Sequence, residues 1–126
     1  MAETGTGGRR RILIVDDDPA LGATLQRILS REHEAEAVTS AADAQARLAG
    51  GESFDVILCD LLMPGMSGMD LHAVLLRDSP DHAARMVFMT GGAFTDRARA
   101  FLDRISNPSI GKPFLAEELL RLVRGV

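Results

Sequence analysis

Three short runs of apolar residues constrain the fold of this chain more than any other feature of its sequence. Each run is continuous rather than alternating, which is typical of strands in a parallel sheet that helices cover on both faces. Each run also stops at a residue with a side-chain oxygen. The runs are Ile12-Leu13-Ile14-Val15 before Asp16, Val56-Ile57-Leu58-Cys59 before Asp60, and Met86-Val87-Phe88-Met89 before Thr90.

Two weaker segments and several helical patterns complete the predicted fold. Residues 34–38 alternate polar and apolar side chains, which predicts an edge strand, and a short segment at 109–111 predicts a fifth strand. Apolar residues recur at helical spacing within 21–29, 71–75, 98–105 and 115–123, and a further helix ends near Gly50. We expect Asp18, Ser40 and Thr95 to cap helices. This alternation of strands and helices predicts right-handed βαβ units and a three-layer α/β sandwich.

Length and composition fit one globular domain. The chain has 126 residues, of which 46% are hydrophobic and 25% charged. Residues 1–10 are rich in glycine and threonine and are interpreted as a flexible N-terminal leader, with the folded domain over residues 11–126. The single cysteine, Cys59, rules out an internal disulfide framework and suits a reducing compartment.

Charge and hydropathy narrow the classes of function. Fourteen basic and 18 acidic residues give a net charge of −4, which argues against a broad nucleic-acid-binding surface. No apolar run approaches the roughly 18 residues of a membrane span, and the first residues lack the apolar stretch of a signal peptide. We therefore expect a cytoplasmic protein that binds neither DNA nor a membrane.

The polar residues at the strand ends are expected to meet in one place. Ligands of an open parallel sheet bind beyond the carboxyl ends of its strands, near the point where the strand order reverses. Three carboxylates gathered there would repel one another, so a cation is needed to balance them. Lys112 supplies one positive charge, and hard carboxylate oxygens suit Mg²⁺ as a further cation. The converging residues are Asp16, Asp17, Asp60, Thr90 and Lys112.

Phosphoryl transfer to a carboxylate is the chemistry that needs this set of residues. A side-chain carboxylate can act as a nucleophile and hold a phosphoryl group as an acyl phosphate. In that scheme Asp60 attacks, while Asp16 and Asp17 hold the metal. Lys112 and the Thr90 hydroxyl contact phosphoryl oxygens. The small residues Gly91 and Gly92 leave room for the group to enter.

At these residues the sequence resembles the receiver domains of two-component response regulators. The acidic opening is Val15-Asp16-Asp17-Asp18-Pro19, and the segment from Asp60 through Met63-Pro64 to Gly68 is similar to the phospho-acceptor segment of that family. Thr90-Gly91 and Lys112-Pro113-Phe114 follow in the expected order. The resemblance runs from about residue 11 to residue 126.

The resemblance implies a (βα)5 flavodoxin-like fold with a five-stranded parallel sheet in the order 2-1-3-4-5. It implies a switch rather than a true enzyme, which catalyses only its own phosphorylation and autodephosphorylation and takes the phosphoryl group from a histidine kinase. The backbone carbonyl of Leu62 would be a further Mg²⁺ ligand, beside Asp16, Asp17 and Asp60. The bond between Lys112 and Pro113 is expected to be cis.

Two departures from the family pattern bear on the output. The family commonly carries an aromatic residue three positions before the lysine, where this chain has Ser109, so the aromatic part of the usual switch is in question. Residues 104–108 look more like the receivers of hybrid sensor kinases than those of transcription factors. With no output domain after Val126, we expect no direct DNA binding. The downstream protein partner is left open, and a homodimer formed on phosphorylation is one option.

Other residues have simpler structural interpretations. We interpret Asp18 as a helix cap rather than a metal ligand and Cys59 as inert core. His33, His72 and His82 lie among polar residues without metal-ligand spacing, so all three are interpreted as surface histidines. Core filler and loop anchors are the roles expected for Met63, Met66, Met69, Met86 and Met89.

Two alternative functions stay open at this point. A constitutive adaptor would use the receiver fold only for binding; Ser109 favours it weakly, whereas the complete set of Asp, Thr and Lys residues argues against it. A phosphatase with an Asp nucleophile would need a second Asp two residues after Asp60 as its acid and base, and Leu62 stands there.

Overall fold

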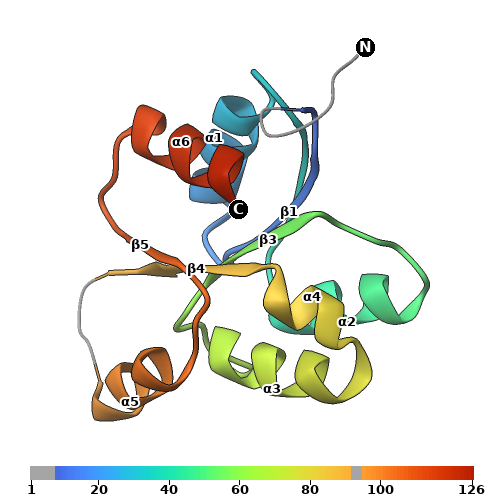
Figure 1. Cartoon of the computed structure of the whole chain (residues 1–126), viewed down its shortest axis with the longest axis vertical. Coiled ribbons are helices and arrows are strands. Elements are labelled where there is room, and N and C mark those ends of the chain that lie inside the picture. Colours follow the sequence, from blue (N-terminus) through green and yellow to red (C-terminus); the bar gives the residue numbers. More distant parts are fainter. Residues whose placement is uncertain (1–7, 92–94) are drawn as a thin grey trace.

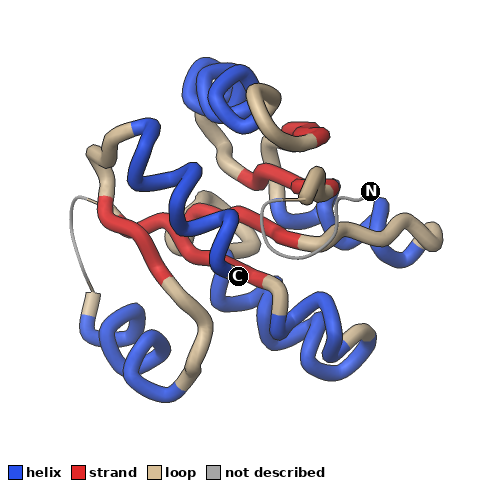
Figure 2. The backbone as a smooth tube through the Cα atoms, turned by 45° about the horizontal axis from the view of Figure 1, so that its top comes forward, coloured by secondary structure: helices blue, strands red, loops and turns tan. Residues whose placement is uncertain are grey.

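The computed structural model describes residues 8–91 and 95–126 of the chain. Five strands alternate with six helices in it (Figures 1 and 2). The strands are β1 (Arg11–Val15), β2 (Glu34–Val38), β3 (Val56–Asp60), β4 (Met86–Thr90) and β5 (Ser109–Gly111). The helices are α1 (Pro19–Leu29), α2 (Ala41–Ala49), α3 (Gly68–Asp78), α4 (Pro80–Ala84), α5 (Asp96–Arg104) and α6 (Ala116–Gly125). Residues 1–7 of the predicted leader and Gly92 lie outside the described residues.

The strands form one parallel sheet in the order β2-β1-β3-β4-β5, as predicted. The three continuous apolar runs are its central strands, and their residues from Ile12, Val56 and Met86 onward are buried on both faces. The alternating segment is the edge strand β2, which pairs Ala35 with Ile12 and leaves Glu34 exposed. Continuous apolar character therefore identified the strands that helices cover on both sides.

Helices cover the sheet in two layers (Figure 1). On one face, α1 and α6 contribute Leu25, Leu29 and Leu119 to a core built on Ile12 and Ile14 of β1. On the other face, the buried side chains of α2, α3, α4 and α5 pack on the alternate residues of the same strands. This is the predicted three-layer sandwich. No helix within the described parts of the chain is long and apolar enough to cross a membrane.

Polar side chains begin the main helices where the sequence predicts them. The Asp18 carboxylate accepts hydrogen bonds from the backbone of Ala20 and Leu21 at the start of α1. Ser40 caps α2 in the same manner, and Thr95 caps α5. Each cap accepts a backbone N–H that lacks a partner within its helix.

The structure adds one short helix that the sequence analysis does not predict. Helix α4 follows α3 after a break at Ser79, whose ψ of 73° is not helical. Pro80 occupies the first position of α4, where its missing N–H costs no hydrogen bond. Five residues are too few to show a helical repeat of apolar side chains, so no periodicity marked this helix.

The interpretation of the three histidines as surface residues is wrong. His33 is 0% exposed, His72 6% and His82 8%. The Arg10 amide donates to Nδ1 of His33 at 3.1 Å, and the Phe54 amide donates to Nε2 of His82 at 3.2 Å. A neutral imidazole can satisfy a buried backbone N–H with its acceptor nitrogen, so polar neighbours in sequence do not imply exposure.

His72 shows which sequence signal was available. It lies on α3 three residues from both Met69 and Leu75, which are buried on the same helix. That spacing places the imidazole on the core face of the helix. There its ring packs against Phe88 and Phe101, with centroids 5.9 and 5.3 Å away.

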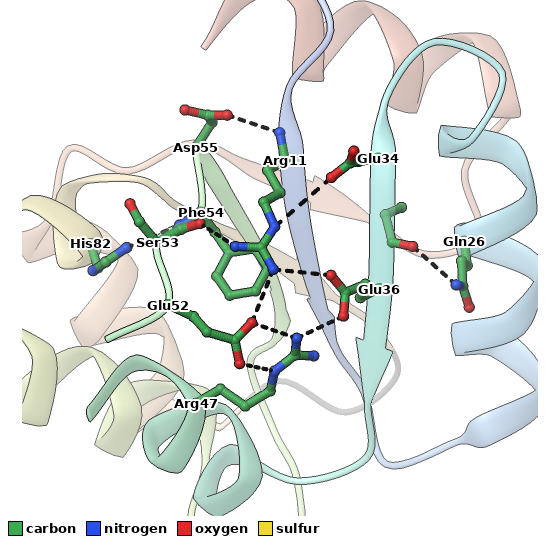
Figure 3. Close-up of polar contacts among 11 residues, drawn as sticks. Arg11, Gln26, Glu34, Glu36, Arg47, Glu52, Ser53, Phe54, Asp55 and His82 are labelled. Carbon is green, nitrogen blue, oxygen red and sulfur yellow. Dashed lines mark hydrogen bonds and ion pairs between the residues drawn. The ribbon is translucent and has the colours of Figure 1, made fainter. Parts of the chain in front are cut away.

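A network of ion pairs lies at the end of the sheet where β1 begins (Figure 3). Arg11 and Arg47 both contact Glu36 and Glu52, at distances of 2.6–3.2 Å. The guanidinium carbons lie 4.4 Å (Arg11) and 5.4 Å (Arg47) from the ring centroid of the buried Phe54. The hydrogen bonds from Arg47 and Arg11, against a smaller opposing effect of burial, lower the pKa of Glu52 to about 2. The network joins α2 to the first two strands.

Candidate functional site

Three carboxylates meet beyond the carboxyl ends of β1 and β3. One oxygen each from Asp16, Asp17 and Asp60 lies within 4.8 Å of the others. Asp16 is 2% exposed, Asp60 is half-buried and Asp17 is open to solvent. The parallel pairing of β1 with β3 produces this approach, because it brings residues 44 positions apart to one sheet edge.

Lys112 follows the last strand and reaches the same carboxylates. Its Nζ lies 3.1 Å from Oδ2 of Asp16 and 3.4 Å from Oδ2 of Asp60. The Lys112 amide donates to the carbonyl of Thr90 at 2.6 Å, which ties the start of the lysine to the end of β4. The peptide bond to Pro113 is cis, as predicted.

The positive charge of Lys112 lies in a site that is otherwise acidic and partly buried. Burial raises the pKa of the Asp60 carboxyl, and the Asp16 charge adds to this effect against the opposing influence of Lys112. Burial lowers the pKa of Lys112, but its hydrogen bond to Asp16 and the charges of Asp60 and Asp16 outweigh burial, so the pKa is raised overall. Lys112 is therefore charged and partly balances the cluster.

Thr90 and Leu62 stand beside Asp60, as the sequence predicts. Asp60, Leu62, Thr90 and Gly91 line one small cavity at the ends of β3 and β4. The Leu62 backbone amide also hydrogen-bonds the Asp60 carboxylate. A group bound to Asp60 would therefore lie next to the Thr90 end of β4.

Backbone contacts hold the carboxylates in place. Oδ1 of Asp16 accepts the Asp18 amide at 2.9 Å, while Asp18 itself caps α1 and is not one of the three clustered carboxylates. The interpretation of Asp18 as a cap is therefore confirmed.

Two glycines permit close approaches around the site. A Cβ on Gly68 would lie 2.4 Å from the carbonyl oxygen of Asp60, and one on Gly91 would lie 3.0 Å from Cβ of Lys112. Gly68 ends the phospho-acceptor motif, and its sequence position alone did not indicate a role. Its structural role follows from this contact, because only a residue without a side chain lets α3 begin so near β3.

The other interpretations near the site are also resolved. Cys59 is buried in β3, where burial together with the charges of Asp60 and Asp16 raises the pKa of its thiol, so the prediction of inert core is confirmed. Met63, Met69, Met86 and Met89 are buried, as expected of core filler. Ser109 is exposed at the start of β5, opposite Phe88, and places no ring beside Thr90.

The donor set fits a hard divalent cation. Asp16, Asp17 and Asp60 all offer carboxylate oxygens, and their spacing lets each contribute one oxygen to a shared ion. Mg²⁺ prefers oxygen ligands, is held by a few carboxylates and keeps water molecules in its shell. Sulfur and imidazole ligands, which suit zinc and copper, are missing from this cluster as described.

Comparison with known proteins agrees with this arrangement. The family model described as "Response regulator receiver domain" matches residues 12–124. A response regulator receiver domain protein (CheY-like) from Methanospirillum hungatei JF-1 superimposes with a TM-score of 0.77 at 27% identity, covering 91% of each chain. A structure described as adenylate cyclase from Rhodopirellula baltica gives a TM-score of 0.81 at 28% identity, covering 93% of this chain and 86% of that one.

Curated relatives include two mycobacterial regulators. The transcriptional regulatory protein TcrA of Mycobacterium tuberculosis is 34% identical over 117 residues, which cover 92% of this chain and 45% of TcrA. The DNA-binding response regulator MtrA of Mycolicibacterium smegmatis is 35% identical over 118 residues, which cover 92% of this chain and 50% of MtrA. The chain thus spans about half the length of these relatives. With its sheet order, its site geometry and the matched family model all in agreement, the chain belongs to the response regulator receiver domain family.

Proposed function

We propose that Asp60 accepts a phosphoryl group from a phosphohistidine of a histidine kinase, in a reaction that requires Mg²⁺. The observation that carries this proposal is the convergence of Asp16, Asp17 and Asp60 within 4.8 Å, with Nζ of Lys112 3.4 Å from Asp60. A cluster of mutually repelling carboxylates serves no purpose in packing, whereas phosphoryl transfer uses both the cation that the cluster attracts and the half-buried nucleophile.

The residues divide the reaction between them. A carboxylate oxygen of Asp60 forms a bond to phosphorus as the bond from phosphorus to the donor imidazole nitrogen breaks, and the nitrogen keeps that electron pair. Asp16, Asp17, Asp60 and the Leu62 carbonyl are the groups that would hold Mg²⁺, which supplies positive charge to the transferring phosphoryl oxygens. Lys112 contacts a further phosphoryl oxygen.

Autodephosphorylation reverses the modification by attack of water on the same phosphorus. No other substrate is needed, so the chemistry is limited to the chain's own acyl phosphate. We propose that this limited chemistry makes the protein a switch rather than an enzyme with turnover of external esters.

The switch acts through Thr90 at the end of β4. A phosphoryl group on Asp60 adds about −1.5 to −2 charges beside the Thr90 end of β4. The Thr90 hydroxyl donates to a phosphoryl oxygen, which draws Thr90 toward Asp60. We propose that the output is a changed protein-binding face around α5 and α6.

Intact mass spectrometry after incubation with Mg²⁺ and acetyl phosphate tests this function. The expected result is one acid-stable, base-labile phosphoryl group, lost in Asp60→Asn and on chelation of Mg²⁺, and formed much more slowly in Lys112→Ala. Asp103→Asn is the matched control, because Asp103 is an exposed carboxylate at the far end of α5. A phosphoryl group that persists in Asp60→Asn, or that forms equally well without Mg²⁺, contradicts the proposal.

A constitutive adaptor is the second candidate, and the exposed Ser109 favours it. Without a ring at this position the chain lacks the side chain that would couple Thr90 to the β5 surface. Partner binding that ignores both Asp60→Asn and beryllofluoride would select the adaptor over the switch.

A further inference from the structure

Helices α3 and α5 enclose a groove on the surface, away from the clustered carboxylates. Its volume is about 390 Å³, within the usual range for sites that bury a ligand or an anchoring side chain. Met69, Ala73 and Leu76 of α3 form one wall, and Phe101 and Ile105 supply the other. Leu76 is 56% exposed, one of three large apolar side chains that stand open to solvent among the described residues.

The rim of the groove carries positive charge in a chain whose net charge is −4. Arg97 and Arg104 line it from α5, and Asp70 lines it from α3. Arg97 pairs with Asp70 at 3.1 Å, which neutralises one arginine. Arg104 has no carboxylate within ion-pairing distance among residues 8–91 and 95–126, and its guanidinium lies 6.0 Å from the Phe101 ring centroid. One arginine at the edge of an apolar floor therefore lacks its counter-charge.

The floor of the groove is preorganised by aromatic packing. The Phe101 ring meets His72 and Phe88 edge-on, with centroids 5.3 Å apart in both pairs. Phe88 belongs to the buried strand β4, so this stack fixes Phe101 to the sheet. A surface held in this way loses little conformational freedom when something binds to it, which favours binding.

We propose that the groove between α3 and α5 docks a segment of a protein partner that is apolar on one face and carries a carboxylate beside it. The apolar side chains of the partner cover Leu76, Ala73 and Ile105 above the buried Phe101 ring, and its carboxylate pairs with Arg104. An amphipathic helix laid between two helices is a common form of such a contact, with affinity concentrated in a few buried anchors. The mixed charge of the rim, with Asp70 beside Arg97, disfavours a nucleic-acid backbone. The proposal is independent of the phosphorylation of Asp60.

A selection on the full chain tests the proposal, with a phage-displayed library of random amphipathic helical peptides as the probe. The expected result is a set of amphipathic peptides in which Asp or Glu lies one helical turn from Leu, Ile or Phe. Arg104→Glu should lower the affinity for these peptides about tenfold or more, which is the effect expected of an anchor residue in an interface. A peptide whose acid is replaced by Lys should regain affinity for Arg104→Glu.

The control reverses the same charge elsewhere. Arg121 lies on α6 and lines a separate cavity with Ile110 and Leu122. The variant Arg121→Glu should therefore leave peptide binding unchanged. Circular dichroism melts show that each variant is folded before binding is compared. The proposal is overturned if no peptide is selected, if acids are not enriched, or if Arg121→Glu weakens binding as much as Arg104→Glu. Self-association that Leu76→Glu abolishes would also overturn it, by making a second copy the occupant.

Discussion

Two glycines that look alike in the sequence should respond to alanine in opposite directions. Gly68 begins α3 and Gly22 lies inside α1, and neither has a positive φ. A Cβ on Gly68 would lie 2.4 Å from the Asp60 carbonyl oxygen, 3.1 Å from Cα of Leu61 and 3.2 Å from Sγ of Cys59. A Cβ on Gly22 would meet only Cβ of Ala37, at 3.5 Å, which is an ordinary contact.

The magnitudes follow from these contacts. Alanine gains about 1 kcal/mol over glycine inside a helix, so Gly22→Ala should stabilise the fold by up to about that amount. At Gly68 the neighbouring atoms belong to backbone and to a buried side chain, so helix and strand must separate by several tenths of an ångström. Overpacking of this kind costs about 1–3 kcal/mol. We expect the overpacking cost of Gly68→Ala to lie near the upper end of this range. After subtraction of the helical gain, the folded state is destabilised by about 2 kcal/mol.

Urea unfolding followed by circular dichroism measures both changes. Gly68→Ala should lower the midpoint at an unchanged m-value, and Gly22→Ala should raise it. Phosphorylation of Gly68→Ala should also slow, since the displaced atoms include the backbone of Asp60. A Gly68→Ala protein as stable as the parent, or a Gly22→Ala protein clearly less stable, would refute the reasoning from contacts.

Three further outcomes are expected. Burial lowers the pKa of His33, His72 and His82 below the ordinary value of about 6.5. The unfolded chain therefore takes up protons first as the pH falls through about 6.5, and stability should drop by about 1.4 kcal/mol per pH unit for each histidine until the folded chain also protonates. Urea midpoints at pH 7.5 and 5.5 check this, and equal values would contradict it. Glu52→Gln should lower the midpoint by removing a shared partner of Arg11 and Arg47, and high salt should shrink the difference. Because the pKa of Glu52 is lowered to about 2, this contribution should be present above pH 4.5 and lost as the pH falls through about 2. Cys59 should not react with a thiol reagent in native buffer, because its thiol is buried and its pKa is raised. It should react in concentrated guanidinium chloride. Rapid labelling of the native protein would contradict this prediction and show that β3 opens.

The sheet could be predicted because burial on two faces leaves a local mark. Residues 12–15, 56–59 and 86–89 are apolar without interruption, and the structure buries all of them. The alternation of residues 34–38 marked the edge position of β2 in the same direct manner. Helix α4 left no such mark because it is shorter than two turns.

The site was predictable in its membership because parallel strands end at a common edge. Asp60 and Thr90 end their strands, and Asp16 and Lys112 directly follow theirs. The sheet topology alone therefore brings these four residues together. Their distances, and the contact of Gly68 with Asp60, depend on how α3 seats against β3. The histidines were misplaced because their polar neighbours in sequence do not show the contacts that bury them, such as the Phe54 amide for His82 and the Phe88 and Phe101 rings for His72.

The sequence by itself determined which segments are strands, which edge of the sheet carries the acids, and which residues cap the helices. These properties depend on runs of neighbouring residues, whose hydrophobicity and spacing are legible along the chain. Only the tertiary structure decided the burial of the histidines, the pairing of Arg11 and Arg47 with shared glutamates, and the groove between α3 and α5. Each of these depends on the approach of segments far apart in the sequence, and packing at that range is a property of the whole fold rather than of any local pattern.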